Sequence, residues 1–158
     1  AADPNAILRV NEFNIESNQA KFEGVKKLLN NLKKQGAPVH ALGWQMHLKP
    51  GSFNPATLLA RMNEIADLGF ENYVSELDVE LQENANAADY EEQKQTIKTA
   101  VETVLAARRL KSIVVWGLRD GDPDWLTENH PQLFNEKLEK KPAYFGVQEA
   151  LKEVKQLP

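Results

Sequence analysis

Two short segments place carboxylates and an imidazole at alternating positions. Glu76 and Asp78 are separated by Leu77, and Gln45 and His47 are likewise two residues apart. If both segments are strands, a period of two puts each polar pair on one face of its strand. An imidazole beside a carboxylate helps to hold it ionised, and such a carboxylate can act as a nucleophile toward an activated carbon. On spacing alone, however, a solvated strand end with an incidental histidine is the slightly favoured interpretation.

The elements that would position these residues repeat along the chain. Four segments are rich in the β-branched, aromatic or leucine residues typical of strands. They span residues 7–13, 39–46, 71–79 and 112–117, and their starts are 32, 32 and 41 residues apart. A helical pattern follows each of the first three at once, and a long loop and then a helix follow the fourth. This alternation predicts parallel strands joined by right-handed crossovers.

Each helical pattern has an apolar stripe and a recognisable start or stop. Gly36 ends the first helix, Asn54 and Pro55 open the second, and Pro142 opens the last. The stripes are Phe22, Val25, Leu28, Leu29 and Leu32, then Leu58, Met62 and Ile65, then Ile97, Val101, Val104 and Leu105, and finally Tyr144, Val147, Leu151 and Val154. These faces predict helices that pack against the sheet.

Both a four-stranded open α/β sheet and half of a (βα)8 barrel fit this order of elements. Side chains that could face a site recur within or at the end of every strand candidate, and such barrels carry their chemistry at the carboxyl ends of their strands. They are Asn11 and Asn14, Gln45 and His47, Glu76 and Asp78, and Trp116 and Asp120. No glycine-rich phosphate loop follows a strand, which argues against a nucleotide-binding sheet. The sequence therefore predicts one domain over residues 1–158, a (βα)4 half of a TIM barrel.

The composition of the chain argues against several classes of partner and of chemistry. The 158 residues carry 19 Lys plus Arg against 23 Asp plus Glu, a net charge of −4, which argues against nucleic acid as a partner. No apolar run approaches the roughly 18 residues that a membrane helix needs, so no membrane partner is predicted. The absence of cysteine excludes disulfides, thiol nucleophiles and cysteine-ligated metal centres.

Five segments, taken in order, resemble a known family. They are residues 11–16 (NEFNIE), 43–48 (GWQMHL), 75–79 (SELDV), 115–120 (VWGLRD) with Trp125, and 141–144 (KPAY). The series is similar to the carboxyl-terminal half of the family 10 glycoside hydrolases, the retaining endo-β-1,4-xylanases, over nearly the whole chain. The resemblance implies strands five to eight of a (βα)8 barrel and xylan or xylo-oligosaccharide as substrate. It also implies no metal or organic cofactor, and a secreted protein.

The resemblance also implies catalytic roles. Glu76 matches the family's nucleophile, His47 the histidine that hydrogen-bonds the nucleophile, and Asp78 the acid that supports this histidine. The family's general acid/base lies on strand four, in an Asn-Glu pair, and the 158 residues contain no Trp-x-x-x-Asn-Glu-like segment that would match it. A retaining glycosidase needs both carboxyl groups. The chain is therefore expected to hold the nucleophile but not the proton donor, and to be inactive alone.

Substrate contacts follow from the same resemblance. Asn11 lies on the motif with which the family lines its cleft, and Gln45 matches an active-site amide. Trp116 and Trp125 resemble the two tryptophans that flank the sugar at the cleavage point, and indole faces suit the apolar faces of pyranose rings. Phe13 stands where the family usually has tyrosine, which puts one sugar contact in doubt.

A half barrel predicts partners of its own. It has two open sheet edges and an uncovered strand face, so we expect an exposed apolar patch and either a complementary amino-terminal half or a second copy. A non-catalytic carbohydrate-binding or scaffold half barrel remains the alternative function, and an unrelated small α/β protein is disfavoured by the ordered motifs. Asp120, Asp122 and Asp124 alternate as in calcium loops, but the other ligands are missing, so an ordinary polar loop is predicted.

Overall fold

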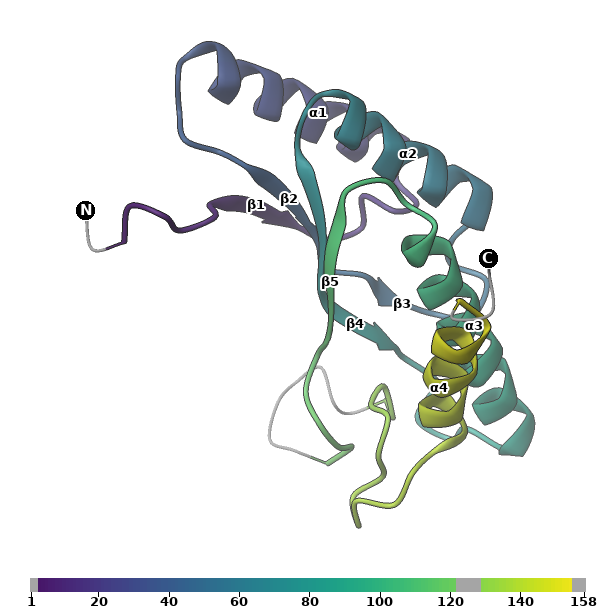
Figure 1. Ribbon diagram of the computed structural model, residues 1–158. Helices are drawn as coiled ribbons and strands as arrows, with labels where there is room; N and C mark the ends of the chain where they lie inside the picture. Colours follow the sequence, from purple (N-terminus) through teal and green to yellow (C-terminus); the bar gives the residue numbers. More distant parts are fainter. Residues whose placement is uncertain (1–2, 122–128, 155–158) are drawn as a thin grey trace.

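The computed structural model describes residues 3–121 and 129–154, and strands alternate with helices along it (Figure 1). The strands are β1 (Arg9–Glu12), β2 (Ala41–Trp44), β3 (His47–Leu48), β4 (Glu71–Val79) and β5 (Leu110–Val115). The helices are α1 (Gln19–Lys34), α2 (Pro55–Asp67), α3 (Ala87–Leu105) and α4 (Pro142–Val154). β2 and β3 follow each other along β4 and both pair with it, so they act as one interrupted strand.

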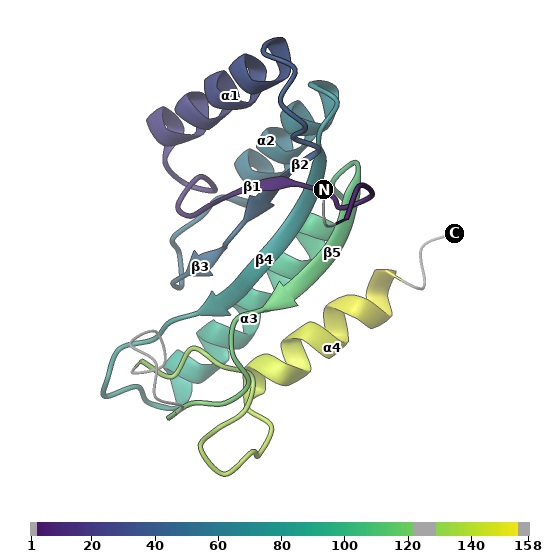
Figure 2. The same cartoon turned by 90° about the vertical axis from the view of Figure 1, so that its left-hand side faces the viewer.

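The described strand pairs are all parallel. β1 pairs with β2, β2 and β3 pair with β4, and β4 pairs with β5. The strands thus lie side by side in chain order, with the helices along one face of the sheet and the other face open (Figure 2). Sequential order with helices on one face is the winding of a barrel, whereas strand order reverses in a doubly wound sheet. The predicted α/β half-barrel of alternating parallel strands and helices is confirmed.

The strand boundaries differ from the predicted ones where the backbone turns. β4 spans the predicted residues 71–79, but β1 is shorter than 7–13 and β5 spans 110–115 instead of 112–117. Met46, with φ 63°, separates β2 from β3 inside the predicted strand 39–46. Gly117, with φ 68°, turns the chain away from the sheet just after Trp116. Both residues lie in the left-handed region, which interrupts a regular strand.

Asparagine caps fix where three of the helices begin. The side chains of Asn18, Asn54 and Asn86 each accept a hydrogen bond from a backbone N–H in the first turn that follows. Pro55 occupies the start of α2, as predicted, and Asp89 completes a capping box at α3. These caps satisfy backbone donors that have no partner inside the helix.

The two end helices of the row expose apolar side chains that the stripes predicted to be buried. Leu28 of α1 is 45% exposed and Leu151 of α4 is 45% exposed. Phe145 of α4, which was not part of the predicted stripe, is 43% exposed. α1 and α4 lie at the two ends of the row of helices (Figure 2), so each has a described neighbouring helix on one flank only. The predicted apolar stripes of α1 and α4 were therefore too wide, because such a width requires a neighbouring helix on both flanks.

The core lies between the sheet and the helices, and a polar crosslink passes through it. Asn72 of β4 is fully buried and accepts a hydrogen bond from Trp44 Nε1 at 2.9 Å. Its Nδ2 donates to the carbonyl oxygens of Met62 at 2.9 Å and Arg108 at 3.0 Å. One side chain thus joins β4 to β2, to α2 and to the turn before β5, in a region where an unpaired polar group is costly.

The open face of the sheet carries polar contacts between neighbouring strands, and the exposed apolar patch expected on it stays a prediction. Arg9 lies over the ring of Tyr73, 5.3 Å from its centroid, and Tyr73 donates to Glu71 at 3.1 Å. Lys111 is 3.2 Å from Glu71. Val114 of β5, 47% exposed, is an apolar exception on this face. Charged and hydroxyl side chains pair across the strands here, which differs from the apolar packing under the helices.

Candidate functional site

The candidate site lies where β1, β3 and β4 end. His47 and Asp78 are register partners, and His47 Nδ1 is 3.1 Å from Asp78 Oδ1. His47 Nε2 is 3.3 Å from Glu76 Oε2. The side chains of Asp78, Glu76 and His47 are 4%, 16% and 23% exposed, so Asp78 lies deepest and Glu76 reaches solvent. The structure thus brings together the imidazole and the two carboxylates that the alternation predicted to meet.

A bulge in β4 shapes this arrangement. Between Trp44↔Val74 and His47↔Asp78, β4 has one residue more than its β2–β3 neighbour. On its other side, between Val74 and Leu77, β4 again has one residue more than β5. Bulges add twist and redirect side chains, and they are common beside active sites. Here the extra residue falls at or next to Glu76.

Asn11 connects β1 to two consecutive residues of the bulge. Its Nδ2 donates to Glu76 Oε1 at 2.6 Å, and its Oδ1 accepts from Ser75 Oγ at 2.6 Å. In a regular strand, Ser75 and Glu76 would point to opposite faces. Since the bulge lets both reach Asn11, Ser75 joins the site although the alternation gave no signal for it. Gly43 leaves the room that Asn11 needs, because a Cβ at Gly43 would overlap Asn11 Oδ1.

The protonation of the site follows from its burial and hydrogen bonds. Burial opposes charge on His47, but its bonds to Asp78 and Glu76 outweigh that effect and raise the pKa of the imidazole. Burial also raises the pKa of Asp78, against the pull of His47. Both shifts make the pair hold a proton more readily. Because each ring nitrogen faces a carboxylate oxygen, the doubly protonated imidazolium is the form that can donate to both.

A third carboxyl group, that of Glu16, lies close enough to His47 for the charge of the imidazole to lower its pKa. Glu16 is 2% exposed, and Oε2 has no hydrogen-bond partner among the residues that the structure describes. Burial raises the pKa of Glu16, and backbone N–H groups of Glu16 and Asn14 oppose the shift. Glu16 stands out in the sequence only as part of the 11–16 segment, because nothing in its spacing shows that the loop after β1 buries it.

The remaining predicted residues have different outcomes. The ring of Trp116 lies edge-on to that of His47, with centroids 6.1 Å apart and an interplanar angle of 85°. Gln45 lies at the break between β2 and β3, and no hydrogen bond joins its side chain to another described residue. Met46, which separates Gln45 from His47, has left-handed backbone, so the shared face of these two side chains stays a prediction. Trp125 lies outside the described residues.

Asp120, the first aspartate of the aspartate-rich loop, forms hydrogen bonds within the protein. Both carboxylate oxygens of Asp120 accept hydrogen bonds from the protein, from Gln132 N and from Lys141 Nζ. Asp122 and Asp124 lie outside the described residues. Within residues 3–121 and 129–154, no group of three or more histidine or acidic side chains could hold a metal ion.

Comparison with known proteins finds a matching family and similar solved structures. A family model described as glycosyl hydrolase family 10 matches residues 1–150. An endo-1,4-beta-xylanase from Agaricus bisporus is 32% identical over 155 residues, which are 92% of this chain and 45% of the relative. The chain is also similar to native xylanase 10B from Thermotoga maritima, with a TM-score of 0.88 and 29% identity, over 97% of this chain and 49% of that one.

A further solved structure shows a relative with a ligand. It is a mutant of an intracellular xylanase from Thermoanaerobacterium saccharolyticum in complex with xylotriose. The TM-score is 0.83 and the identity 33%, over 92% of this chain and 45% of that chain. The chain therefore spans about half the length of the solved xylanases that it matches.

Proposed function

This chain belongs to glycosyl hydrolase family 10, and from that premise we propose that it is the nucleophile-bearing part of a retaining endo-1,4-β-xylanase. The half-barrel would supply strands five to eight of a (βα)8 barrel, as one domain over residues 1–158. The substrate would be xylan or a xylo-oligosaccharide, since a relative is known in complex with xylotriose. The observation that carries this proposal is that each carboxylate oxygen of Glu76 lies within hydrogen-bond distance of a side-chain nitrogen, one of His47 and one of Asn11.

The geometry fits a nucleophile that must approach one carbon atom from one direction. Glu76 Oε1 is held by Asn11 Nδ2 and Oε2 by His47 Nε2, so the carboxylate cannot turn freely about its own axis. In the proposed reaction Glu76 attacks the anomeric carbon and the bond to the departing sugar oxygen breaks. His47 and Asp78 would orient Glu76 and stabilise its negative charge until the attack. Water then releases the sugar from Glu76.

The departing sugar needs a proton, which the described residues of the site do not supply in this scheme. The general acid/base would stand about 5 Å from the nucleophile, as retaining enzymes require. On the family resemblance, that group would lie on a strand that precedes β1 in the barrel. Trp116 and Trp125 would stack on the sugar at the cleavage point, and Gln45 would contact it. These assignments of Gln45 and Trp125 rest on the motif alone.

The edges of the half-barrel indicate what would complete it. β1 and β5 each pair with one described strand, and the helices next to them expose Leu28, Phe145 and Leu151. A complementary half barrel would cover both sheet edges and both helix flanks. A second copy could cover the edges too, but it would bring Trp116 where the acid/base belongs and so would leave the site incomplete.

Where the protein acts is a separate proposal. None of the helices in residues 3–121 and 129–154 has the length and apolar content to cross a membrane. Secretion would give the enzyme access to polymeric xylan. One similar xylanase is nevertheless described as intracellular, so family membership alone does not place this chain outside the cell.

Reconstitution tests the proposed function. The chain is mixed with a separately produced amino-terminal half of Thermotoga maritima xylanase 10B, and release of reducing sugar from xylan is measured. We expect hydrolysis from the mixture and none from either part alone, together with a 1:1 complex by light scattering. Binding of xylo-oligosaccharides without turnover in a stable 1:1 complex would instead support the non-catalytic carbohydrate-binding half barrel.

The space left by Gly43 gives a second prediction. In Gly43→Ala the new Cβ would displace Asn11, so Glu76 would lose one of its two donors. A hydrogen bond to a charged group is worth about 1.5–3 kcal/mol, so the turnover of the reconstituted enzyme should fall about 10- to 100-fold. Gly24→Ala is the matched control, since a Cβ there meets nothing within 4 Å, and its turnover should equal that of the parent. Equal turnover in both variants would show that Asn11 does not support Glu76.

A further inference from the structure

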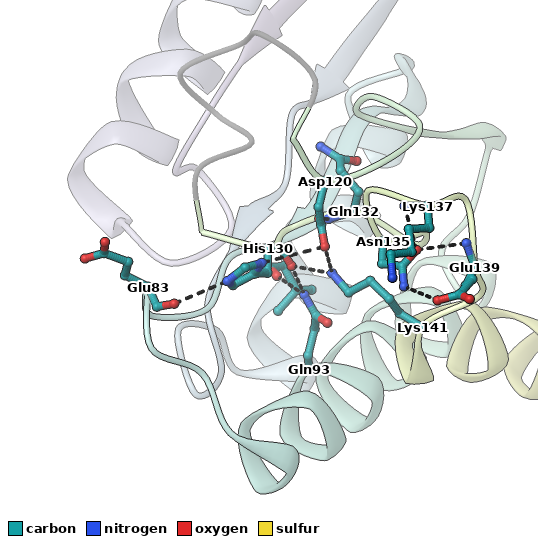
Figure 3. A network of polar contacts seen from close by, with 10 residues as sticks. Glu83, Gln93, Asp120, His130, Gln132, Asn135, Lys137, Glu139 and Lys141 are labelled. Atoms are coloured by element: carbon teal, nitrogen blue, oxygen red, sulfur yellow. Dashed lines mark hydrogen bonds and ion pairs between the residues drawn. The ribbon is translucent and has the colours of Figure 1, made fainter.

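We propose that the buried ion pair between Asp120 and Lys141 is a positioning device that fixes Trp116 beside His47. Asp120 lies in the segment that follows β5, and Lys141 directly precedes α4; Figure 3 shows the two side chains with their polar neighbours. The role of Trp116 in holding a sugar rests on the proposed function, whereas the placement of its side chain by the ion pair does not.

The pair is nearly closed to solvent, and each of its members makes two hydrogen bonds. Lys141 Nζ donates to Asp120 Oδ2 at 2.7 Å and to the carbonyl oxygen of His130 at 2.6 Å. The side chains of Lys141 and Asp120 are 5% and 4% exposed. Asp120 Oδ1 accepts from the backbone N–H of Gln132 at 2.9 Å. A buried charge pair with this many partners is tied to one geometry, because removal of either member leaves the other charge uncompensated.

The same network is attached to the strand that carries the proposed nucleophile. Gln93, which is fully buried on α3, donates through Nε2 to the carbonyl oxygens of His130 and Val79, each at 2.6 Å. Val79 is the last residue of β4 and follows Asp78 directly. Figure 3 shows Gln93, His130, Asp120 and Lys141 converging from different segments. Through these hydrogen bonds the ion pair is connected to the end of β4 as well as to its own loop.

Trp116 is held between two anchors. Before the turn, its backbone N–H donates to the carbonyl oxygen of Leu77 on β4 at 3.1 Å. After the turn, the N–H of Asp120 donates to the carbonyl oxygen of Phe134 at 2.9 Å, and the Asp120 side chain enters the ion pair. Between them lies Gly117, at which a Cβ would crowd the side chain of Gln132. Loosening the Asp120 anchor should therefore release the turn that sets the direction of the indole.

Fluorine NMR of the chain labelled with 5-fluorotryptophan tests this inference. The sequence has three tryptophans, and single Trp→Phe variants assign their signals. Trp44 is fully buried in the core and reports the fold, whereas Trp116 reports the site. We expect Lys141→Met to shift or broaden the Trp116 signal while the Trp44 signal stays in place. The readout needs no hydrolysis, so failure of the proposed function leaves it intact.

Two further variants complete the design. Lys140→Met is the matched control, because the ammonium of Lys140 lies over the Tyr144 ring and outside the network, and it should move neither signal. Asp120→Asn keeps the shape of the side chain and removes its charge, so it decides the matter if Lys141→Met does not fold; we expect it to move the Trp116 signal alone. An unchanged Trp116 signal in the folded variants would overturn the inference. Loss of the Trp44 and Trp116 signals together in both variants would also overturn it, since the pair would then serve the fold as a whole.

Discussion

Replacement of Glu76 by glutamine should abolish xylan hydrolysis by the reconstituted enzyme while its fold is retained. Glutamine keeps the shape of the side chain and can still contact Asn11, but its amide is not a nucleophile and cannot form the covalent intermediate. Loss of a nucleophile lowers turnover by about 10⁴-fold or more in enzymes where it has been measured. The expected result is therefore turnover at least that far below the parent, with an unchanged circular dichroism spectrum.

The same strand offers a matched control for this variant. Glu71 lies at the opposite end of β4, where it contacts Lys111 and Tyr73 on the open face. Glu71→Gln makes the identical chemical change far from the proposed chemistry, so hydrolysis should stay close to that of the parent. Parent-like hydrolysis by Glu76→Gln would remove the nucleophile assignment. A large loss in Glu71→Gln would show that activity responds to the barrel interior as a whole.

Replacement of Asn72 by alanine should lower the stability of the fold strongly while it leaves the site untouched. Alanine cannot accept from Trp44 Nε1 and cannot donate to the carbonyl oxygens of Met62 and Arg108. An unsatisfied buried donor or acceptor costs about 1–3 kcal/mol. We expect the free energy of unfolding to fall by about 3 kcal/mol on that basis, measured from the urea midpoint and slope.

An exposed asparagine provides the comparison. Asn31 lies on the surface of α1, and Asn31→Ala removes the same atoms from a position that suits alanine. Its unfolding midpoint should match or slightly exceed that of the parent. Equal midpoints for both variants would mean that the crosslink through Asn72 does not hold the sheet to the helices.

The central strand shows how far the sequence could predict this fold. Residues 71–79 were assigned to a strand with the bounds that β4 has, because nine residues of mixed apolar and polar character leave little choice. The bulge at Ser75 and Glu76 was missed, since a bulge is a mismatch between neighbouring strands and no single segment carries it. The break at Met46 was missed for a related reason, because only tertiary contacts hold a buried methionine in left-handed backbone.

The candidate site, too, could be predicted only in part from the sequence. Local spacing placed His47, Glu76 and Asp78 together, since adjacent parallel strands align residues at their carboxyl ends. The bond from Asn11 to Glu76 spans 65 residues, and the bond from Lys141 to Asp120 spans 21. In the sequence, Lys141 was noted only as the first residue of the 141–144 segment. Pairings of this length depend on how strands twist and loops return, so residue types alone did not reveal them.

The most direct measurement of the central claim is to trap the covalent intermediate. A 2-deoxy-2-fluoro-xylobioside with a good leaving group reacts with a retaining nucleophile, and the fluorine slows release, so the labelled enzyme accumulates. The reconstituted enzyme is treated with this reagent, digested and sequenced by tandem mass spectrometry. The account predicts one fluoroxylobiosyl label on the peptide that carries Glu76, at the Glu76 side chain. A label on any other carboxylate, or hydrolysis of xylan by an enzyme that never becomes labelled, would contradict it.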